Sequence, residues 1–176
     1  NDSSVTGTYF FLNDRLDFHD SELHRLLKWI EKGNSVFLIA ENISPNLLDT
    51  LGLELEISFP KNSFSSKPMF NLTDKALQRK EPFLFDRETY QYVFSKYDSL
   101  QQKVLGISQL YSDSLASTEP KPNFLMDSIG KGAIYLNTSP KAFSNFFLLE
   151  DDNYEYAARA LGYIPAEKTL YWDQYY

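Results

Sequence analysis

The chain has 176 residues, of which 43% are hydrophobic, and this size predicts one globular domain over residues 1–176. Its 17 basic and 24 acidic residues give a net charge of −7, and the scattered basic residues argue against nucleic acid as a partner. Because there is no cysteine, disulfides, thiolate metal sites and cysteine nucleophiles are excluded. No apolar run approaches the roughly 18 residues of a membrane span. Aromatic residues at 16% indicate a core rich in sheet.

The first third of the chain predicts a strand, a helix and a second strand. "TYFFL" (8–12) is a β-rich run. In "DSELHRLLKWIEKG" the apolar residues recur at helical spacing, with Asp20 or Ser21 as the N-cap and Gly33 just beyond the end. The continuous apolar run "SVFLIAE" (35–41) is typical of a strand buried on both faces in a parallel sheet. Together these segments predict a βαβ unit.

The next segments predict a short helix and several strands. "ISPNLLDTLG" indicates a helix that begins after Ser44 and stops at Gly52, and an alternating strand, "LELEISF", follows it. From 61 to 122, short runs such as "KPMFNL", "YQYVF" and "KVLGISQLY" alternate with turn residues. We interpret 61–122 as an antiparallel, loop-rich insertion, with "SDSLASTEPKP" as its mobile loop.

The last third begins with a hairpin. Two β-rich runs, "NFLMDSI" and "AIYLNTS", flank Gly130, Lys131 and Gly132. A helix follows, with its buried face expected at Tyr154, Ala157, Ala158 and Leu161, and "TLYWDQYY" is expected to be a final strand. The whole pattern predicts an α/β fold with a mainly parallel central sheet flanked by helices. The alternative is an α+β fold with a mixed sheet, which the hairpin favours.

The stretch "GKGAIYLNTSPKAFSNFFLLEDDN" (130–153) holds the candidate ligand-binding residues. Its apolar residues, from Phe143 to Leu149, are expected to bury the chain crossing. Asn145 lies among them, so its amide must either pair with the backbone or face a ligand. Asp151 and Asp152 are expected to start the last helix, where negative charge is favourable, or else to form a carboxylate pair. With Asn153, these residues are the candidates for ligand binding.

Other residues that could carry chemistry have simpler interpretations. His19 and His24 could bind a metal, but a third ligand is missing and surface histidines are favoured. Ser139 or Ser144 could be a nucleophile, but neither lies in a G-x-S-x-G motif, and helix capping explains Ser139. The tyrosines of "YQYVF" and "YWDQYY" form either a stacking platform for sugar or peptide, or core packing. The sequence therefore predicts no catalytic residue, no metal site and no cofactor.

Several segments together resemble a known family: "YFFLND", "LHRLLKWIEKGNSVFLIAENI", "LLDTLGL", "GKGAIYLNTSPKAFSNFFLLEDDNYEYAARALGYIP" and "YWDQYY". The chain is similar to bacterial, Bacteroidetes-type membrane-anchored domains of unknown function. The resemblance implies a glutamine-amidotransferase-like, flavodoxin-like fold, genes beside those of MoxR-type ATPases, and an upstream strand and helix that are shortened here. Without cysteine, amidotransferase chemistry is excluded.

Two hypotheses for function follow from these observations. The first is a non-catalytic interaction or scaffold domain that is extracytoplasmic, tethered to the membrane by segments outside this chain, and bound to proteins of a membrane complex associated with MoxR. The second is a binder or hydrolase of cell-envelope glycan or peptide with a carboxylate-containing cleft. An enzyme should show a cleft with converging titratable groups, whereas an interaction domain should show an exposed apolar patch.

Overall fold

The computed structural model describes residues 5–58, 66–111 and 118–173. Its strands are β1 (Thr8–Leu12), β2 (Arg15–Leu16), β3 (Ser35–Ile39), β4 (Asn42–Ile43), β5 (Glu54–Ser58), β6 (Lys67–Leu72), β7 (Phe83–Leu84), β8 (Gln91–Lys96), β9 (Gln102–Tyr111), β10 (Lys121–Ile129), β11 (Gly132–Asn137) and β12 (Leu170–Trp172). Its helices are α1 (Asp20–Glu31), α2 (Pro45–Leu51), the 3-10 helix η1 (Pro140–Phe143), α3 (Asn145–Leu148) and α4 (Tyr154–Leu161).

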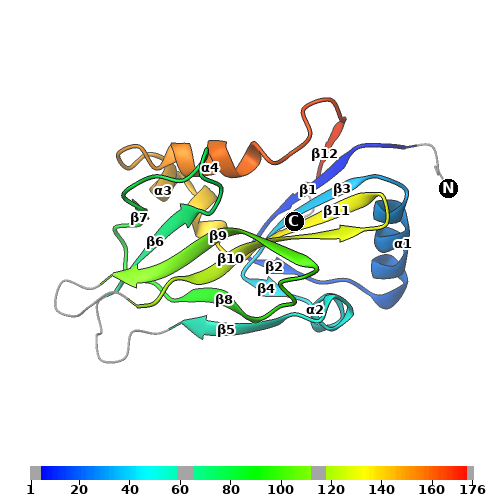
Figure 1. Ribbon diagram of the computed structural model, residues 1–176, viewed down its shortest axis with the longest axis horizontal. Helices are drawn as coiled ribbons and strands as arrows, with labels where there is room; N and C mark the ends of the chain where they lie inside the picture. Colours follow the sequence, from blue (N-terminus) through cyan, green and yellow to red (C-terminus); the bar gives the residue numbers. More distant parts are fainter. Residues whose placement is uncertain (1–4, 59–65, 112–117, 174–176) are drawn as a thin grey trace.

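One curled, mixed sheet of eight strands dominates the molecule (Figure 1). The strand order is β12-β1-β3-β11-β10-β9-β6-β7, and two small sheets pair β2 with β4 and β5 with β8. Strands β12, β1, β3 and β11 pair with one another in parallel. From β11 to β7 every pairing is antiparallel.

The expected mainly parallel sheet flanked by helices is therefore wrong, and the mixed-sheet alternative agrees with the strand order. The predicted β1–α1–β3 unit is confirmed, because α1 connects two adjacent parallel strands. Strand β11 lies next to β3 and is parallel to it. Because β11 follows β10 through a hairpin, no crossover helix connects it directly to β3. The antiparallel strands β6, β7 and β9 then extend the same sheet.

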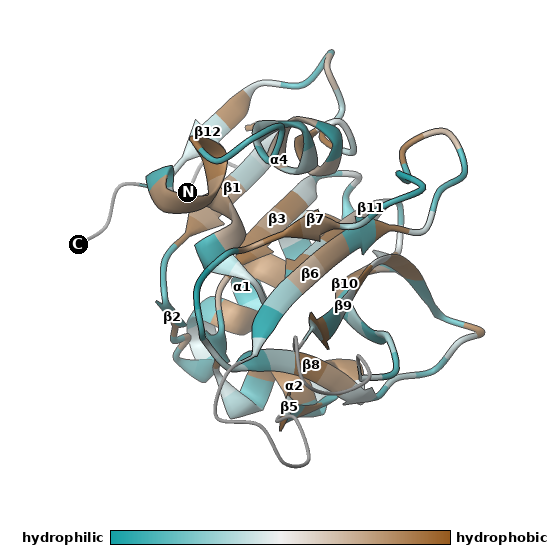
Figure 2. Cartoon of the chain, turned by 90° about the vertical axis from the view of Figure 1, so that its left-hand side faces the viewer, coloured by the Kyte–Doolittle hydropathy of each residue, from teal (hydrophilic) through white to brown (hydrophobic). Residues whose placement is uncertain are grey.

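The central strand β3 is buried on both faces, as its continuous apolar run predicted. Phe37 and Ile39 enter a core that also contains residues of α3 and α4, whereas Val36 and Leu38 enter a second core with residues of α1, α2 and β8. Figure 2 shows hydrophobic residues along β3, between α4 on one side and α1 on the other. The sheet is thus a shared wall between two apolar layers.

The helix ends follow local rules with two corrections. The N-cap of helix α1 is His19, not Asp20 or Ser21 as predicted, and the Glu22 carboxylate accepts a hydrogen bond from the His19 backbone N–H at 3.0 Å. Helix α2 has Ser44 and Gly52 at its ends, as predicted. In α4 the buried residues are Tyr156, Ala157 and Ala160, and Leu161 is half-buried against the same core, so the expected face is wrong at Tyr154 and Ala158.

None of the helices in the described ranges combines the length and the hydrophobicity that a membrane crossing requires. Of the predicted mobile loop "SDSLASTEPKP", residues 112–117 lie outside the described residues. The same applies to the last three residues of the predicted strand "TLYWDQYY", whose described part contains β12.

The turn between β10 and β11 packs tightly against the end of α1. A Cβ atom on Gly132 would lie 2.1 Å from the Asn34 carbonyl oxygen and 2.2 Å from that of Ile30. We expect Gly132→Ala to lower the free energy of unfolding by about 3 kcal/mol, because backbone atoms would have to move. Urea denaturation followed by circular dichroism measures the change.

Gly52→Ala is the matched control, because Gly52 has a φ of +67° and no atom within 4 Å of an added Cβ. We expect Gly52→Ala to lower the free energy of unfolding by about 1 kcal/mol, because only the left-handed backbone conformation opposes the new side chain. Equal costs for the two substitutions would show that the contact between the hairpin and α1 is not tight.

Candidate functional site

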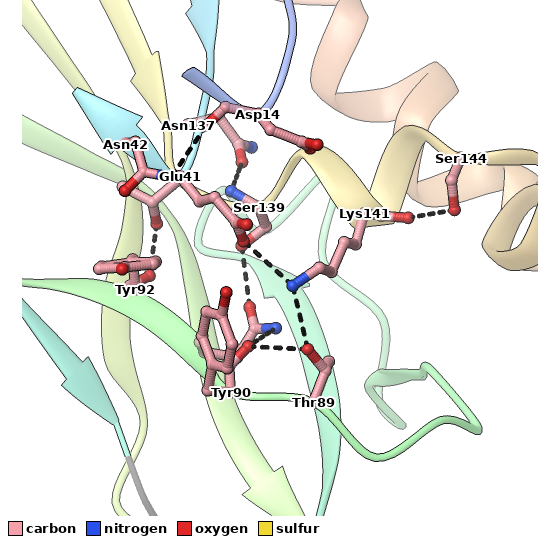
Figure 3. Close-up of polar contacts among 12 residues, drawn as sticks. Asp14, Glu41, Asn42, Thr89, Tyr90, Tyr92, Asn137, Ser139, Lys141 and Ser144 are labelled. Carbon is pink, nitrogen blue, oxygen red and sulfur yellow. Dashed lines mark hydrogen bonds and ion pairs between the residues drawn. The ribbon is translucent and has the colours of Figure 1, made fainter. Parts of the chain in front are cut away.

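The candidate site lies where the carboxyl ends of the parallel strands meet. Glu41 follows β3 by two residues, Asn137 is the last residue of β11, and Ser139 follows two residues later. In open sheets with parallel strands, this edge is the usual place for ligands. Figure 3 shows these side chains together with Thr89 and Tyr90, from the segment before β8, and Lys141, from η1. We call this group the carboxyl-edge cluster.

A charged pair holds one side of the cluster together. The Lys141 Nζ atom donates to the Glu41 Oε2 atom at 3.1 Å and to the Thr89 Oγ1 atom at 3.0 Å, and it lies 4.4 Å from the centre of the Tyr90 ring (Figure 3). The Glu41 side chain is only 11% exposed. Because a buried carboxylate without a partner is costly, this lysine compensates the charge of Glu41.

A network of neutral polar groups forms the buried side of the cluster. The Ser139 Oγ atom accepts from Asn123 at 3.0 Å and donates to the Gln91 side-chain oxygen at 3.1 Å. The Ser139 backbone N–H donates to the Asn137 side-chain oxygen at 2.8 Å. The Tyr156 hydroxyl accepts from the side-chain amides of Asn123 and Asn137, both at 3.3 Å. Burial raises the pKa of Tyr156, which keeps the phenol neutral.

This arrangement does not activate either serine considered as a nucleophile. The Ser139 hydroxyl is directed at an amide oxygen and the residue is 2% exposed, while the Ser144 hydroxyl donates to the Lys141 carbonyl at 2.7 Å. A nucleophilic serine needs a basic group at this position. Both serines thus have structural partners. Ser139 precedes η1, as expected, but its side chain makes no capping hydrogen bond.

Beside Glu41 lies a hollow of about 360 Å³, which we call the carboxyl-edge hollow. Its lining includes Arg15, Asp17, Glu41, Asn42, Ser44 and Tyr92. Strands β2 and β4 place Arg15 and Asn42 next to each other, because these residues are register partners. The hollow thus combines charged, amide and aromatic groups at one edge of the sheet.

The predicted candidates lie elsewhere, around α3. Asn145 begins α3 and is exposed, so its apolar neighbours in the sequence do not bury its amide, and a role in binding stays a prediction. Phe146 and Leu149 are also exposed, at 64% and 85%, whereas Phe147 is fully buried. Helix α3 is short, and of these three residues only Phe147 faces the core. The segment from Phe143 to Leu149 is therefore less buried than predicted.

The acids before α4 are not its first residues. Asp151 and Asp152 are exposed in a turn, Asp151 has a φ of 43°, and Asn153 is the N-cap. The Asn153 side chain is buried and donates to the Leu84 carbonyl at 2.8 Å, which ties the turn to β7. Asn153 therefore has a structural partner, and the acids are surface groups next to α3.

The histidines lie on the outside of the molecule. His19 caps α1, and His24 is exposed on the same helix. Among residues 5–58, 66–111 and 118–173, no three side chains of His, Asp or Glu are placed to hold a metal ion.

The sequence reasoning missed the carboxyl-edge cluster. Glu41 and Asn137 could have been found, because Glu41 ends the predicted strand "SVFLIAE", Asn137 lies two residues before the end of "AIYLNTS", and ligands collect outside the carboxyl ends of parallel strands. Gln91 and Lys141 could not, because 50 residues or more separate each of them from Glu41 and only the fold brings the segments together.

Comparisons with known proteins give a family and several structural neighbours. A family model with the description "Domain of unknown function (DUF4350)" matches residues 2–161. No curated protein sequence matches the chain.

The structural neighbours share the fold at low identity. The N-terminal domain of mmIFT52 superposes with a TM-score of 0.60 at 13% identity, over 89% of this chain and 76% of that chain. The cytoplasmic protein STM1381 from Salmonella typhimurium LT2 superposes with a TM-score of 0.50 at 13% identity, over 92% of this chain and 72% of that chain. A beta-galactosidase from Bacillus circulans sp. alkalophilus gives 0.50 at 12% identity, over 89% of this chain but only 22% of the enzyme.

We expect Tyr156→Phe to lower the free energy of unfolding by about 1–3 kcal/mol, because the amides of Asn123 and Asn137 lose a buried acceptor. Tyr154→Phe is the control on the same helix, because Tyr154 is 55% exposed, and its cost should stay within about 0.5 kcal/mol. Equal stability of Tyr156→Phe and wild type in urea denaturation would show that the network adds nothing to stability.

Proposed function

The chain belongs to the family described as "Domain of unknown function (DUF4350)", and on this premise we propose that it is a non-catalytic protein-interaction domain. The observation that carries the proposal is the exposure of two large apolar side chains, Phe146 and Leu149, on the surface around α3. This surface, the α3 surface, comprises Asp86, Arg87, Asn145, Phe146, Leu149 and Glu150, and it encloses an open hollow of about 380 Å³.

The chemistry of the α3 surface fits a protein partner. Phe146 and Leu149 project their apolar side chains into solvent, and the Arg87 guanidinium lies 4.1 Å from the centre of the Phe146 ring. Exposed aromatic residues and arginine are typical of the residues that contribute most to protein interfaces. Glu150 belongs to the surface, and the exposed Asp151 and Asp152 follow it in the chain, so negative charge lies on one side of the apolar residues. The complementary partner carries an apolar cluster edged by lysine or arginine.

The carboxyl-edge cluster supports the non-catalytic part of the proposal. Its serine hydroxyl donates to an amide, and its carboxylate is paired with Lys141. General acid–base or nucleophilic catalysis requires groups that can exchange protons with a substrate. In this cluster the polar groups are instead engaged with one another.

The family resemblance supplies the setting of the proposal. We place the domain outside the cytoplasm of a bacterium, held at the membrane by segments outside this chain, in a complex associated with MoxR-type ATPases. Fractionation of the full-length gene product, with protease accessibility of the domain in spheroplasts, tests this placement. Recovery of the full-length product in the cytosolic fraction would contradict it.

One observation supports the other hypothesis, a binder or hydrolase of cell-envelope glycan or peptide. This observation is the carboxyl-edge hollow beside Glu41. A hydrolase would need a carboxylate that is available to substrate, whereas Glu41 is held by Lys141. Binding requires only the hollow and its polar lining. Of the two forms of this hypothesis, the hollow therefore favours a binder over a hydrolase.

We expect Phe146→Ser/Leu149→Ser to abolish partner capture at the α3 surface without loss of thermal stability, since both side chains are exposed. The measurement uses the full-length protein in membranes, with a photo-cross-linking amino acid at position 146 and mass spectrometry of the products. The double variant is compared with wild type by co-purification of the protein identified in this way.

Leu100 is the matched control position, because it is 94% exposed and lies in the turn between β8 and β9. A specific partner should cross-link from position 146 and not from position 100, and Leu100→Ser should leave co-purification unchanged. The same products from both positions, or full capture by the double variant, would refute the α3 surface as the interface.

A further inference from the structure

A third hollow, separate from the α3 surface, lies beside β1 on the side of the sheet that faces α1. It has a volume of about 690 Å³, and we call it the β1 hollow. Tyr9 and Phe11 belong to its lining, and because they are two residues apart on a strand, they lie on the same face. Phe18, from the segment before α1, also lines it. The β1 hollow thus offers three aromatic rings.

Polar groups accompany these rings. The Tyr9 hydroxyl donates to the Asp173 carboxylate, and burial, followed by this hydrogen bond, raises the pKa of Tyr9, so that the phenol keeps its proton. The Arg15 guanidinium donates to Asp17, and the side chains of these two residues are 73% and 58% exposed. Asn13 adds an amide with both donors and an acceptor.

The two hollows adjoin at one point. Arg15 and Asp17 line both the β1 hollow and the carboxyl-edge hollow. Tyr92 and Asn42 line the carboxyl-edge hollow but not the β1 hollow. Aromatic rings therefore lie on both sides of the Arg15–Asp17 pair, in an arrangement that suits a long ligand better than a compact one.

The charges select against an anionic ligand. The lining of the β1 hollow includes the carboxylates of Asp17, Glu22 and Asp173, but only Arg15 among the lysines and arginines. A phosphate or an acidic saccharide would approach more negative than positive charge. Carboxylates, amides and a guanidinium can each accept from or donate to neutral hydroxyl groups.

The backbone disfavours an extended peptide in the β1 hollow. Strand β1 is paired with β3 along its whole length and with β12 from Thr8 to Phe10, so most of its backbone N–H and C=O groups already have partners. A peptide that adds to a sheet needs an unpaired strand edge. The β1 hollow instead offers side chains: flat aromatic faces for the C–H surface of sugar rings and planar polar groups for hydroxyls.

We propose that the two hollows form one groove that binds a neutral, linear oligosaccharide across the Arg15–Asp17 pair. Sugar rings on one side stack against the aromatic residues of the β1 hollow, and those on the other side reach Tyr92. Arg15 and Asp17 hydrogen-bond the hydroxyl groups of the sugar between them. This site does not depend on the α3 surface or on a protein partner.

The test uses cellohexaose, chitohexaose and mannohexaose as neutral probes, titrated into the purified chain by isothermal titration calorimetry. We expect at least one probe to bind, and Arg15→Ala/Asp17→Ala to weaken its binding by about tenfold or more, because hydrogen bonds to charged groups are lost. Both side chains are largely exposed, so the double variant should keep the wild-type melting temperature.

Arg25→Ala is the control for charge removal, because Arg25 is exposed on α1 and belongs to neither lining, and it should bind as wild type. Phe146→Ser/Leu149→Ser should also bind as wild type, which separates this proposal from the interaction function. Absence of binding by all three probes, unchanged affinity of the Arg15/Asp17 variant, or tighter binding of a lysine-rich peptide or of polygalacturonate would each overturn the proposal.

Discussion

Burial of β3 on both faces is the constraint on which the rest of the structure depends. Its alternate side chains enter two different cores, so Phe37 packs among aromatic residues such as Phe10 and Phe124, while Val36 and Leu38 pack on the other side of the sheet. If the register of β3 shifted by one residue, the side chains of each core would move to the opposite face of the sheet, where the core has a different shape. The register with β1 and β11 is thereby determined, and with it the position of Glu41 beyond the end of the strand.

Local patterns predicted the elements better than their arrangement. The periodicity of α1, the proline and glycine at the ends of α2 and the glycines between β10 and β11 are all local signals, and all three elements are present. The strand order is not a local property, because a run such as "KPMFNL" shows that a strand forms but not which strand it joins. The segment 61–122, predicted as an antiparallel insertion, contains β6, β7 and β9, and the sequence does not show that these strands extend the main sheet.

Helix α4 and the residues before it show why the candidate site could not be fully predicted. Helical spacing favoured a face with Tyr154, yet Tyr156 is the residue that is fully buried. Its hydroxyl has acceptor positions for Asn123 and Asn137, which belong to β10 and β11. Such a match depends on partners that are distant in sequence, so amphipathic spacing cannot reveal it. The same limit applies to Asn145, whose apolar neighbours in the sequence do not surround it in the fold.

The Glu41–Lys141 pair connects this packing to the groove. A buried ion pair adds little net stability compared with apolar residues of similar size, so stability alone does not account for it. The pair connects segments of the chain. Lys141, in η1, binds Glu41 in the segment after β3 and Thr89 in the segment before β8. Tyr92 lies on that same strand β8 and lines the carboxyl-edge hollow. The pair therefore keeps one wall of the hollow in place while its own charges remain neutralised. A hollow whose wall is held by compensated charges suits recognition of neutral groups better than proton transfer.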